Sequence, residues 1–133
     1  MTRVVFEYSA DCNRPVAEVI IQNGKHKHKF LAIIDSGADR TTIPKDVGEL
    51  LNLEPIEKKE IKKLTGIGGT INAVLRNVRL EIGDYNFPAD IFWLFENEGY
   101  FLLGRDVFER FDILFKQNPE KKVIFESDKG KLG

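Results

Sequence analysis

The chain has 133 residues, with 20 basic and 21 acidic side chains and a formal net charge of −1. This length is typical of one globular domain, and an apolar content of 42% is enough to build a core without disulfides. The balanced charge argues against a general binder of nucleic acids or membrane surfaces, because such proteins carry a basic excess.

Targeting segments, disulfides and metal sites are also disfavoured. The longest apolar runs, such as residues 91–95, are far shorter than the ~20 residues of a membrane-spanning helix. The first residues include a charge and no small-residue cleavage site, so a signal peptide is not expected. Cys12 is the only cysteine, and His26 and His28 are the only histidines, which disfavours disulfides and zinc sites. We therefore expect a cytoplasmic protein that uses no metal or other cofactor.

Most of the chain consists of short segments rich in β-branched and aromatic residues, separated by turn-forming residues. This pattern predicts an all-β fold with one or two short helices. In chain order, strands are expected at residues 16–22, 25–34 and 41–43, on both sides of 66–69, twice within 75–95, and at 101–103, 111–115 and 123–125. Helical turns are expected at residues 45–52 and 106–110, with Asp106 placed to cap the second.

Residues 62–74 carry three glycines between two β-like arms, which predicts a flexible hairpin. A phosphate-binding loop is a weaker alternative, because the third glycine of Gly-x-Gly-x-x-Gly and the lysine of a P-loop are missing. A plain β-turn between surface strands is the other alternative. The charged segment 57–63 is expected to be a surface strand leading into the hairpin, and its lysines could favour acidic substrates.

Asp35 is the sharpest candidate for chemistry. It follows the apolar segment 30–34 directly and precedes the small residues Ser36, Gly37 and Ala38, which let backbone or a ligand come close. A carboxylate held in a partly desolvated loop can act as a general base on water. The same pattern is also typical of an ordinary Asx turn that closes a strand, so the loop alone leaves both interpretations open.

Three motifs together favour the catalytic interpretation of Asp35 over an ordinary turn. Residues 33–41, with Asp-Ser-Gly-Ala after two isoleucines, resemble the active-site loop of retropepsin-like aspartic proteases. Residues 101–106, an apolar run followed by Gly-Arg-Asp, resemble the second mark of this family, and the Gly-Ile-Gly-Gly of residues 66–69 resembles its flap tip. The three motifs also occur in the family's order. The resemblance covers about residues 16–126 and implies one domain, 1–133, with a closed acid-protease barrel, a flap hairpin and one or two short helices.

The resemblance also implies a mechanism. Such proteases use two facing carboxylates that share a proton: one activates a water, and the other donates to the scissile carbonyl. Only one Asp-Ser-Gly occurs in this chain, so the second Asp35 would come from another copy in a two-fold dimer. The implied function is that of a homodimeric aspartic endopeptidase acting on peptides or proteins in extended form. Its implied partners are a second copy and the substrate, with no nucleic acid and no membrane.

The family pattern further implies roles for individual residues. The Ser36 hydroxyl would brace the two loops, Gly37 would offer its carbonyl to the substrate, and Asp39 would bind substrate backbone. Arg105 would pair with Asp39, because a planar guanidinium can hold a carboxylate with two bonds. The remaining implied residues are Ala38 in the active-site loop, Ile67, Gly68 and Gly69 in the flap, and Gly104 and Asp106 as structural support.

Some features depart from the family pattern or leave other functions open. Arg40 stands where many relatives have a small or acidic residue, which could change subsite preference. The chain also extends past the Gly-Arg-Asp helix by a hairpin, so the geometry of a dimer does not follow from the resemblance. A catalytically silent module that dimerises or binds peptides is the alternative function. A small-ligand-binding β-barrel is a third possibility, but it explains none of the three motifs together.

Overall fold

The computed structural model describes residues 2–11, 13–66, 69–95 and 100–127. Within these residues the chain is built almost entirely of strands, as the sequence predicts. The elements are β1 (Thr2–Glu7), β2 (Val16–Asn23), β3 (His26–Ile34), β4 (Thr42–Ile43), α1 (Lys45–Leu50), a 3-10 turn η1 (Lys58–Glu60), β5 (Lys62–Gly66), β6 (Gly69–Ile82), β7 (Tyr85–Leu94), β8 (Leu102–Leu103), α2 (Arg105–Phe108), β9 (Asp112–Lys116) and β10 (Lys122–Ser127).

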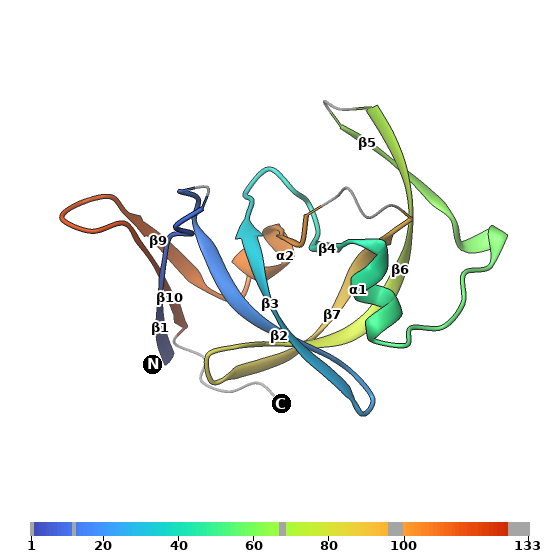
Figure 1. Ribbon diagram of the computed structural model, residues 1–133, viewed down its shortest axis with the longest axis horizontal. Coiled ribbons are helices and arrows are strands. Elements are labelled where there is room, and N and C mark those ends of the chain that lie inside the picture. The colour runs from blue at the N-terminus through green and yellow to red at the C-terminus, as the bar shows by residue number, and fades with distance from the viewer. Residues whose placement is uncertain (1, 12, 67–68, 96–99, 128–133) are drawn as a thin grey trace.

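Seven strands form a closed sheet around the main core. Their order is β2-β3-β8-β4-β7-β6-β5, and an additional pairing between β2 and β6 closes the sheet on itself (Figure 1). Alternate side chains of β2 point inward, and Val19 and Ile21 are completely buried. The fully buried Tyr85 and Phe87 of β7 stack edge to face with ring centroids 5.5 Å apart. The predicted closed all-β barrel is confirmed.

The strand β6 is longer than the sequence suggests. It runs without interruption for 14 residues, pairing with β5 at its start and with β7 from Ala73 to Ile82. The expectation of a separate strand beginning at residue 75 is therefore wrong, because the pairing partner changes at Ala73 while the strand itself continues. The β5–β6 hairpin rises from the barrel as a continuation of this long strand (Figure 1).

Two short strands, β8 and β4, complete the closed sheet between β3 and β7. The strand β8 runs parallel to β3 and antiparallel to β4, while β4 runs parallel to β7. The parallel pairing of β3 with β8 brings the loop after β3 next to the segment that begins α2. The segment before β5 contains the 3-10 turn η1, so the expected surface strand over residues 57–63 begins only at Lys62.

A second, three-stranded sheet lies at the end of the molecule opposite β5, and its order is β1-β10-β9 (Figure 1). The two terminal strands of the chain pair with each other, with Val5 opposite Ile124. Phe6 and Phe125 meet edge to face on the core side, with centroids 5.7 Å apart. The outer strand β9 is hydrogen-bonded on one side only among the described residues, and its Leu114 is 53% exposed.

Among the described residues, no helix is long and apolar enough to cross a membrane.

Candidate functional site

Asp35 stands at the end of β3, in a turn held by its own backbone and carboxylate. Its N–H donates to the carbonyl of Leu103 at 3.0 Å, and its carbonyl accepts from the N–H of Ala38 at 3.2 Å. Its Oδ1 accepts a hydrogen bond from the N–H of Gly37 at 2.9 Å. The Asx-type turn is therefore present, and it fixes a half-buried carboxylate at the end of a core strand.

The Gly-Arg-Asp segment is locked against this loop. The N–H of Arg105 donates to the carbonyl of Ala38 at 2.8 Å, and its guanidinium forms an ion pair with Asp39. A Cβ at Gly104 would lie 2.5 Å from the carbonyl carbon of Arg40, closer than real Cβ atoms approach any atom. Glycine is required at position 104 because the two backbones touch there. The predicted Asp39–Arg105 pair is present.

Asp106 plays a different part from the helix cap that the sequence suggested. The residue before α2 is Gly104, and the helix has no side-chain cap. Instead, Asp106 Oδ1 accepts hydrogen bonds from both the N–H and the hydroxyl of Thr41, each at 2.9 Å. Thr41 is completely buried, so its polar groups need partners inside the protein, and the Asp106 carboxylate supplies them. Asp106 thus supports the loop that follows β3, and Thr41 is a supporting residue that the sequence analysis did not single out.

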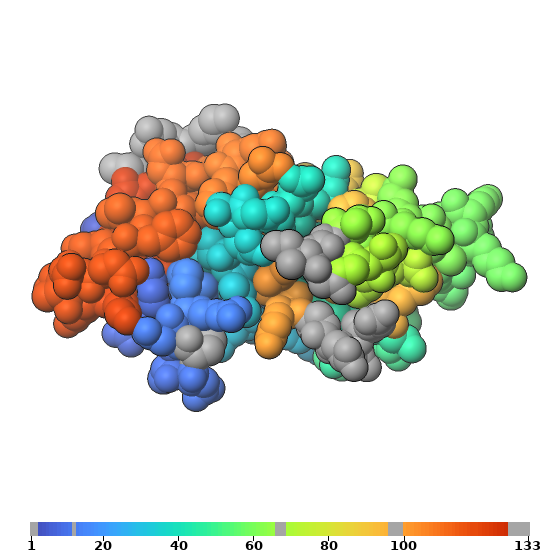
Figure 2. All heavy atoms as spheres, turned by 90° about the horizontal axis from the view of Figure 1, so that it is seen from above, coloured from blue at the N-terminus to red at the C-terminus, as the bar shows by residue number. Residues whose placement is uncertain are grey.

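A cleft of about 650 Å³ lies between the loop after β3 and the β5–β6 hairpin. The two sides of this cleft appear on the same face of the molecule in Figure 2, in turquoise and light green. Gly69 lines the cleft and has a φ of +113°, a conformation that favours glycine. Ile67 and Gly68 lie outside the described residues. The lining consists of Gly37, Ala38, Asp39, Arg40, Thr42, Lys63, Leu64, Thr65, Gly69, Thr70, Ile71, Phe92 and Leu102.

Arg40 is fixed at one side of the cleft. Its Nη1 donates to the carbonyl oxygen of Asp90 at 3.0 Å, and its Cζ lies 5.7 Å from the centre of the Phe92 ring. Phe92 also lines the cleft and is half-buried. Its neighbour Trp93 points the other way, is buried and donates its Nε1–H to the carbonyl of Lys45 at 3.0 Å.

A second hollow, of about 410 Å³, adjoins the loop next to α2. It is lined by Ser36, Asp39, Arg105, Phe108 and Glu109. Ser36 is exposed here, so its hydroxyl is available to a group that approaches this side of the loop.

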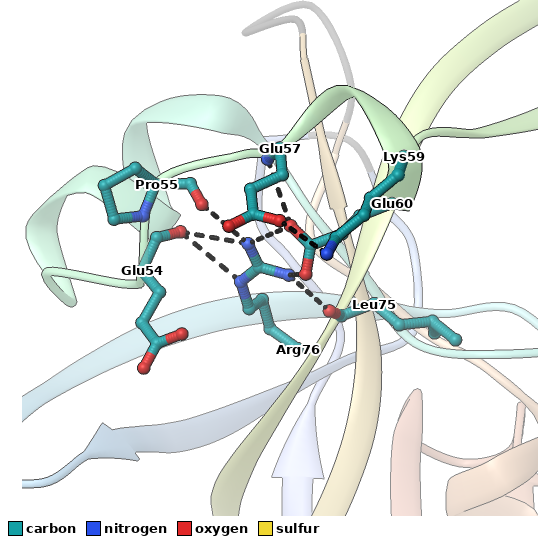
Figure 3. A network of polar contacts seen from close by, with 7 residues as sticks. All are labelled: Glu54, Pro55, Glu57, Lys59, Glu60, Leu75 and Arg76. Atoms are coloured by element: carbon teal, nitrogen blue, oxygen red, sulfur yellow. Dashed lines mark hydrogen bonds and ion pairs between the residues drawn. The ribbon is translucent and has the colours of Figure 1, made fainter.

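The base of the hairpin is held by Arg76 of β6 (Figure 3). Its guanidinium donates to Glu60 Oε1 at 3.2 Å and Oε2 at 3.0 Å, and to the carbonyls of Glu54 and Pro55 at 3.1 Å each. The Arg76 side chain is only 11% exposed. The hydrogen bond from Arg76, followed by one from the Glu57 backbone N–H, holds the pKa of Glu60 below its ordinary 4.5. This clamp ties the segment before β5 to the long strand that continues into the hairpin.

Neither histidine lies near the loop that carries Asp35. His26 and His28 are on β3 close to the turn that joins it to β2, opposite Asn23 and Ile21, while Asp35 follows the other end of the strand. Cys12 lies outside the described residues. Within the described residues, no group of three or more histidine, cysteine or acidic side chains is placed to hold a metal ion.

Comparison with known proteins agrees with this geometry. The family model described as aspartyl protease matches residues 17–107. A search of the curated proteins gives no match. Among solved structures, a retropepsin-like aspartic protease from Rickettsia conorii is similar with a TM-score of 0.68 and 17% identity, over 93% of this chain and 98% of that one. The EIAV protease, solved with the inhibitor HBY-793, is similar with a TM-score of 0.60 and 17% identity, over 76% of this chain and 90% of that one. The chain thus belongs to the aspartyl protease family, as an aspartic-type peptidase with a retropepsin-like fold.

Proposed function

We propose that the chain is a homodimeric endopeptidase in which Asp35 from each of two copies forms the catalytic pair. The observation that carries this proposal is the fixed, half-buried Asp35 carboxylate, in a loop whose next residues line a 650 Å³ cleft. The chain contains one Asp-Ser-Gly loop, so a site with two carboxylates needs a second copy.

The chemistry requires that the two carboxylates share one proton, because two like charges at hydrogen-bond distance disfavour full ionisation. The ionised Asp35 takes a proton from a water molecule, whose oxygen attacks the scissile carbonyl carbon. The protonated Asp35 of the other copy donates its proton to the carbonyl oxygen, giving a tetrahedral diol. Return of a proton to the amide nitrogen then breaks the C–N bond and releases an acid and an amine.

Substrate would lie extended in the cleft between the loop and the hairpin. An extended peptide can bond the backbone of the hairpin as an added strand, with the Gly37 carbonyl and Asp39 on the other side. Leu64, Ile71 and Leu102 line the cleft and offer apolar contacts to alternate side chains. Ile67, Gly68 and Gly69 complete the substrate-binding set of the flap in this proposal.

The outer edge of β9 is the proposed contact with the second copy. In the sheet order β1-β10-β9, the strand β9 is one of two outer strands, and its outer edge is unpaired among the described residues. Leu114 and Phe115 on this strand are 53% and 39% exposed, and burial in a dimer would remove both from water. The helix α2, which carries Arg105, leads directly into β9 and so links the active-site loop to this edge.

The experiment follows cleavage of an unfolded protein, reduced and alkylated casein, across a pH series. Asp35→Asn is expected to lower the rate by about 10³-fold or more, while circular dichroism and sedimentation stay unchanged. Asp84→Asn, an exposed turn residue, is the matched control and should cleave normally. Full activity of the Asp35→Asn variant would overturn the assignment. A folded dimer of the natural chain that cleaves nothing at any pH would favour the catalytically silent module.

A further inference from the structure

The cleft carries a fixed cation, Arg40, whose charge no carboxylate of the described residues neutralises by direct contact. Arg40 is held by the carbonyl oxygen of Asp90 and by the face of Phe92, and both of these partners leave its positive charge in place. Among the described residues, Arg40 forms no ion pair within 4.0 Å, and only its Nη1 makes a hydrogen bond. The other guanidinium N–H groups are therefore available as donors.

The other charged side chains that line the cleft add to the positive charge of Arg40. Lys63 of β5 also lines the cleft and forms no ion pair with a described residue. Among the described residues of the lining, Asp39 is the one acidic residue, and Arg105 pairs with it from the neighbouring hollow. The described part of the lining therefore carries two cations without an ion pair and one anion that is paired, a balance that favours a positive local potential although the whole chain has a net charge of −1.

Three acidic side chains also lie near Arg40, and they affect the electrostatic potential at its guanidinium. Asp90, Asp106 and Glu109 line a small hollow of about 160 Å³ together with Arg40. Asp90 Oδ1 accepts from Asn77 at 2.9 Å, and Asp106 Oδ1 accepts from Thr41. These carboxylates lower the positive potential at Arg40 but do not occupy its donors.

We infer that the cleft selects extended peptides carrying an acidic side chain at the position that faces Arg40. A substrate carboxylate there would accept charge-assisted hydrogen bonds from the guanidinium, while its methylene groups would pack on Phe92. Because the Phe92 ring and the Asp90 carbonyl already hold Arg40, little side-chain entropy is lost when the pair forms. The inference rests on the proposed function, since it concerns the substrate of the same cleft.

The first experiment profiles cleavage sites in a mixture of peptides made by digesting a bacterial lysate. For the natural chain we expect Asp and Glu to be enriched at one fixed position within four residues of the cleaved bond. Arg40→Gln should abolish the enrichment, and Arg40→Glu should replace it with Lys and Arg. Lys25→Gln, a matched charge change in the exposed β2–β3 turn, should leave the profile unchanged.

The second experiment compares two synthetic peptides that differ only by Glu or Gln at the enriched position. The Glu peptide should have a kcat/KM about five- to tenfold higher at low salt, as expected for a partly exposed charge-assisted pair. This ratio should fall as salt is raised, because exposed charges are screened, and it should fall to about one in Arg40→Gln. Lys63→Gln should reduce the ratio only in part, because Arg40 remains.

The outcomes distinguish a failure of the substrate preference from a failure of the proposed peptidase function. Cleavage of the mixture with no acidic enrichment, or with an enrichment that Arg40→Glu does not change, overturns the substrate preference and leaves the peptidase proposal standing. Absence of any cleavage, with a folded dimer, overturns the proposed function and the preference together. A Glu-to-Gln ratio within twofold of one for the natural chain also overturns the preference.

Discussion

Asp106 and Thr41, which are 65 positions apart in the sequence, are joined by two hydrogen bonds of 2.9 Å each. This contact connects the Asp-Ser-Gly loop to the Gly-Arg-Asp segment. It continues through the Thr41 hydroxyl, which accepts a hydrogen bond from the N–H of Gly104 at 3.2 Å. The loop that carries Asp35 is thereby held by a buried polar network around Thr41, and such networks are costly to break.

Removing the carboxylate of Asp106 should destabilise the fold. Asp106→Ala leaves the buried N–H and hydroxyl of Thr41 without their acceptor, at an expected cost of about 2–4 kcal/mol in the free energy of unfolding. Asp106→Asn keeps one acceptor oxygen and should cost roughly half as much. Urea unfolding monitored through Trp93 measures both variants. Asp84→Ala is the control, and an equal loss in control and variant would contradict the role assigned to Asp106.

The close contact at Gly104 gives a second prediction. Gly104→Ala forces the new methyl group against the Arg40 backbone, so we expect a loss of about 2–3 kcal/mol and a displaced Asp35 loop. Gly24→Ala is a useful contrast, because position 24 has a φ of +59° but open space around it. That variant should cost about 1 kcal/mol and keep full activity. Thermal unfolding and casein cleavage are measured on both variants. Equal losses of stability and activity in Gly104→Ala and Gly24→Ala would contradict the close contact as the reason for glycine at position 104.

The clamp between Arg76 and Glu60 predicts a dependence on pH. Arg76 lowers the pKa of Glu60 below 4.5, so the folded state favours the ionised carboxylate. The stabilisation is therefore complete above the unfolded pKa and is lost as the pH falls through the lower folded pKa. We expect Glu60→Gln to be less stable than the natural chain at pH 7 and the gap to close toward pH 2. Glu49→Gln serves as the control in urea unfolding at both pH values. A gap that stays constant with pH would contradict the clamp.

A dimer formed through the outer edge of β9 predicts that specific activity depends on enzyme concentration. Specific activity should fall as the chain is diluted below the dimer dissociation constant, because each site of the proposed dimer needs two copies. Leu114→Lys should raise that constant by at least about tenfold, since it places a charge in a contact that buries apolar surface. Leu50→Lys, on α1 with an equally exposed leucine at 54%, is the matched control. Sedimentation and dilution assays that show no difference between the two variants would place the dimer contact elsewhere.

Local patterns in the sequence predict most of the fold. The hairpin at Asn23 and Gly24, the short strands and helices, and the late pair β9–β10 all follow from turn residues and β-branched runs. The barrel closure between β2 and β6 does not, because register between distant strands depends on packing that no short segment encodes.

The candidate site is predictable only where its residues lie within short sequence patterns. The motifs indicate Asp35 and the pairing of Asp39 with Arg105, because each lies within a short pattern. The clamp made by Arg76 escapes such patterns, since its acceptors include two backbone carbonyls more than 20 positions earlier. Asp106 is misjudged for a related reason: its position in a helical turn suggests a cap, while a buried threonine far away in the sequence competes for it.

The pairing of β1 with β10 completes the terminal sheet within one chain, without the second copy of the proposed dimer. Each chain forms its terminal sheet from its own strands, so burial of Phe6 against Phe125 does not require a partner. In the proposed dimer, a protomer would then keep its native structure at concentrations where it meets no second copy. Folding of the chain and the encounter of two protomers would be separate equilibria, and a change in expression level would act on the second alone.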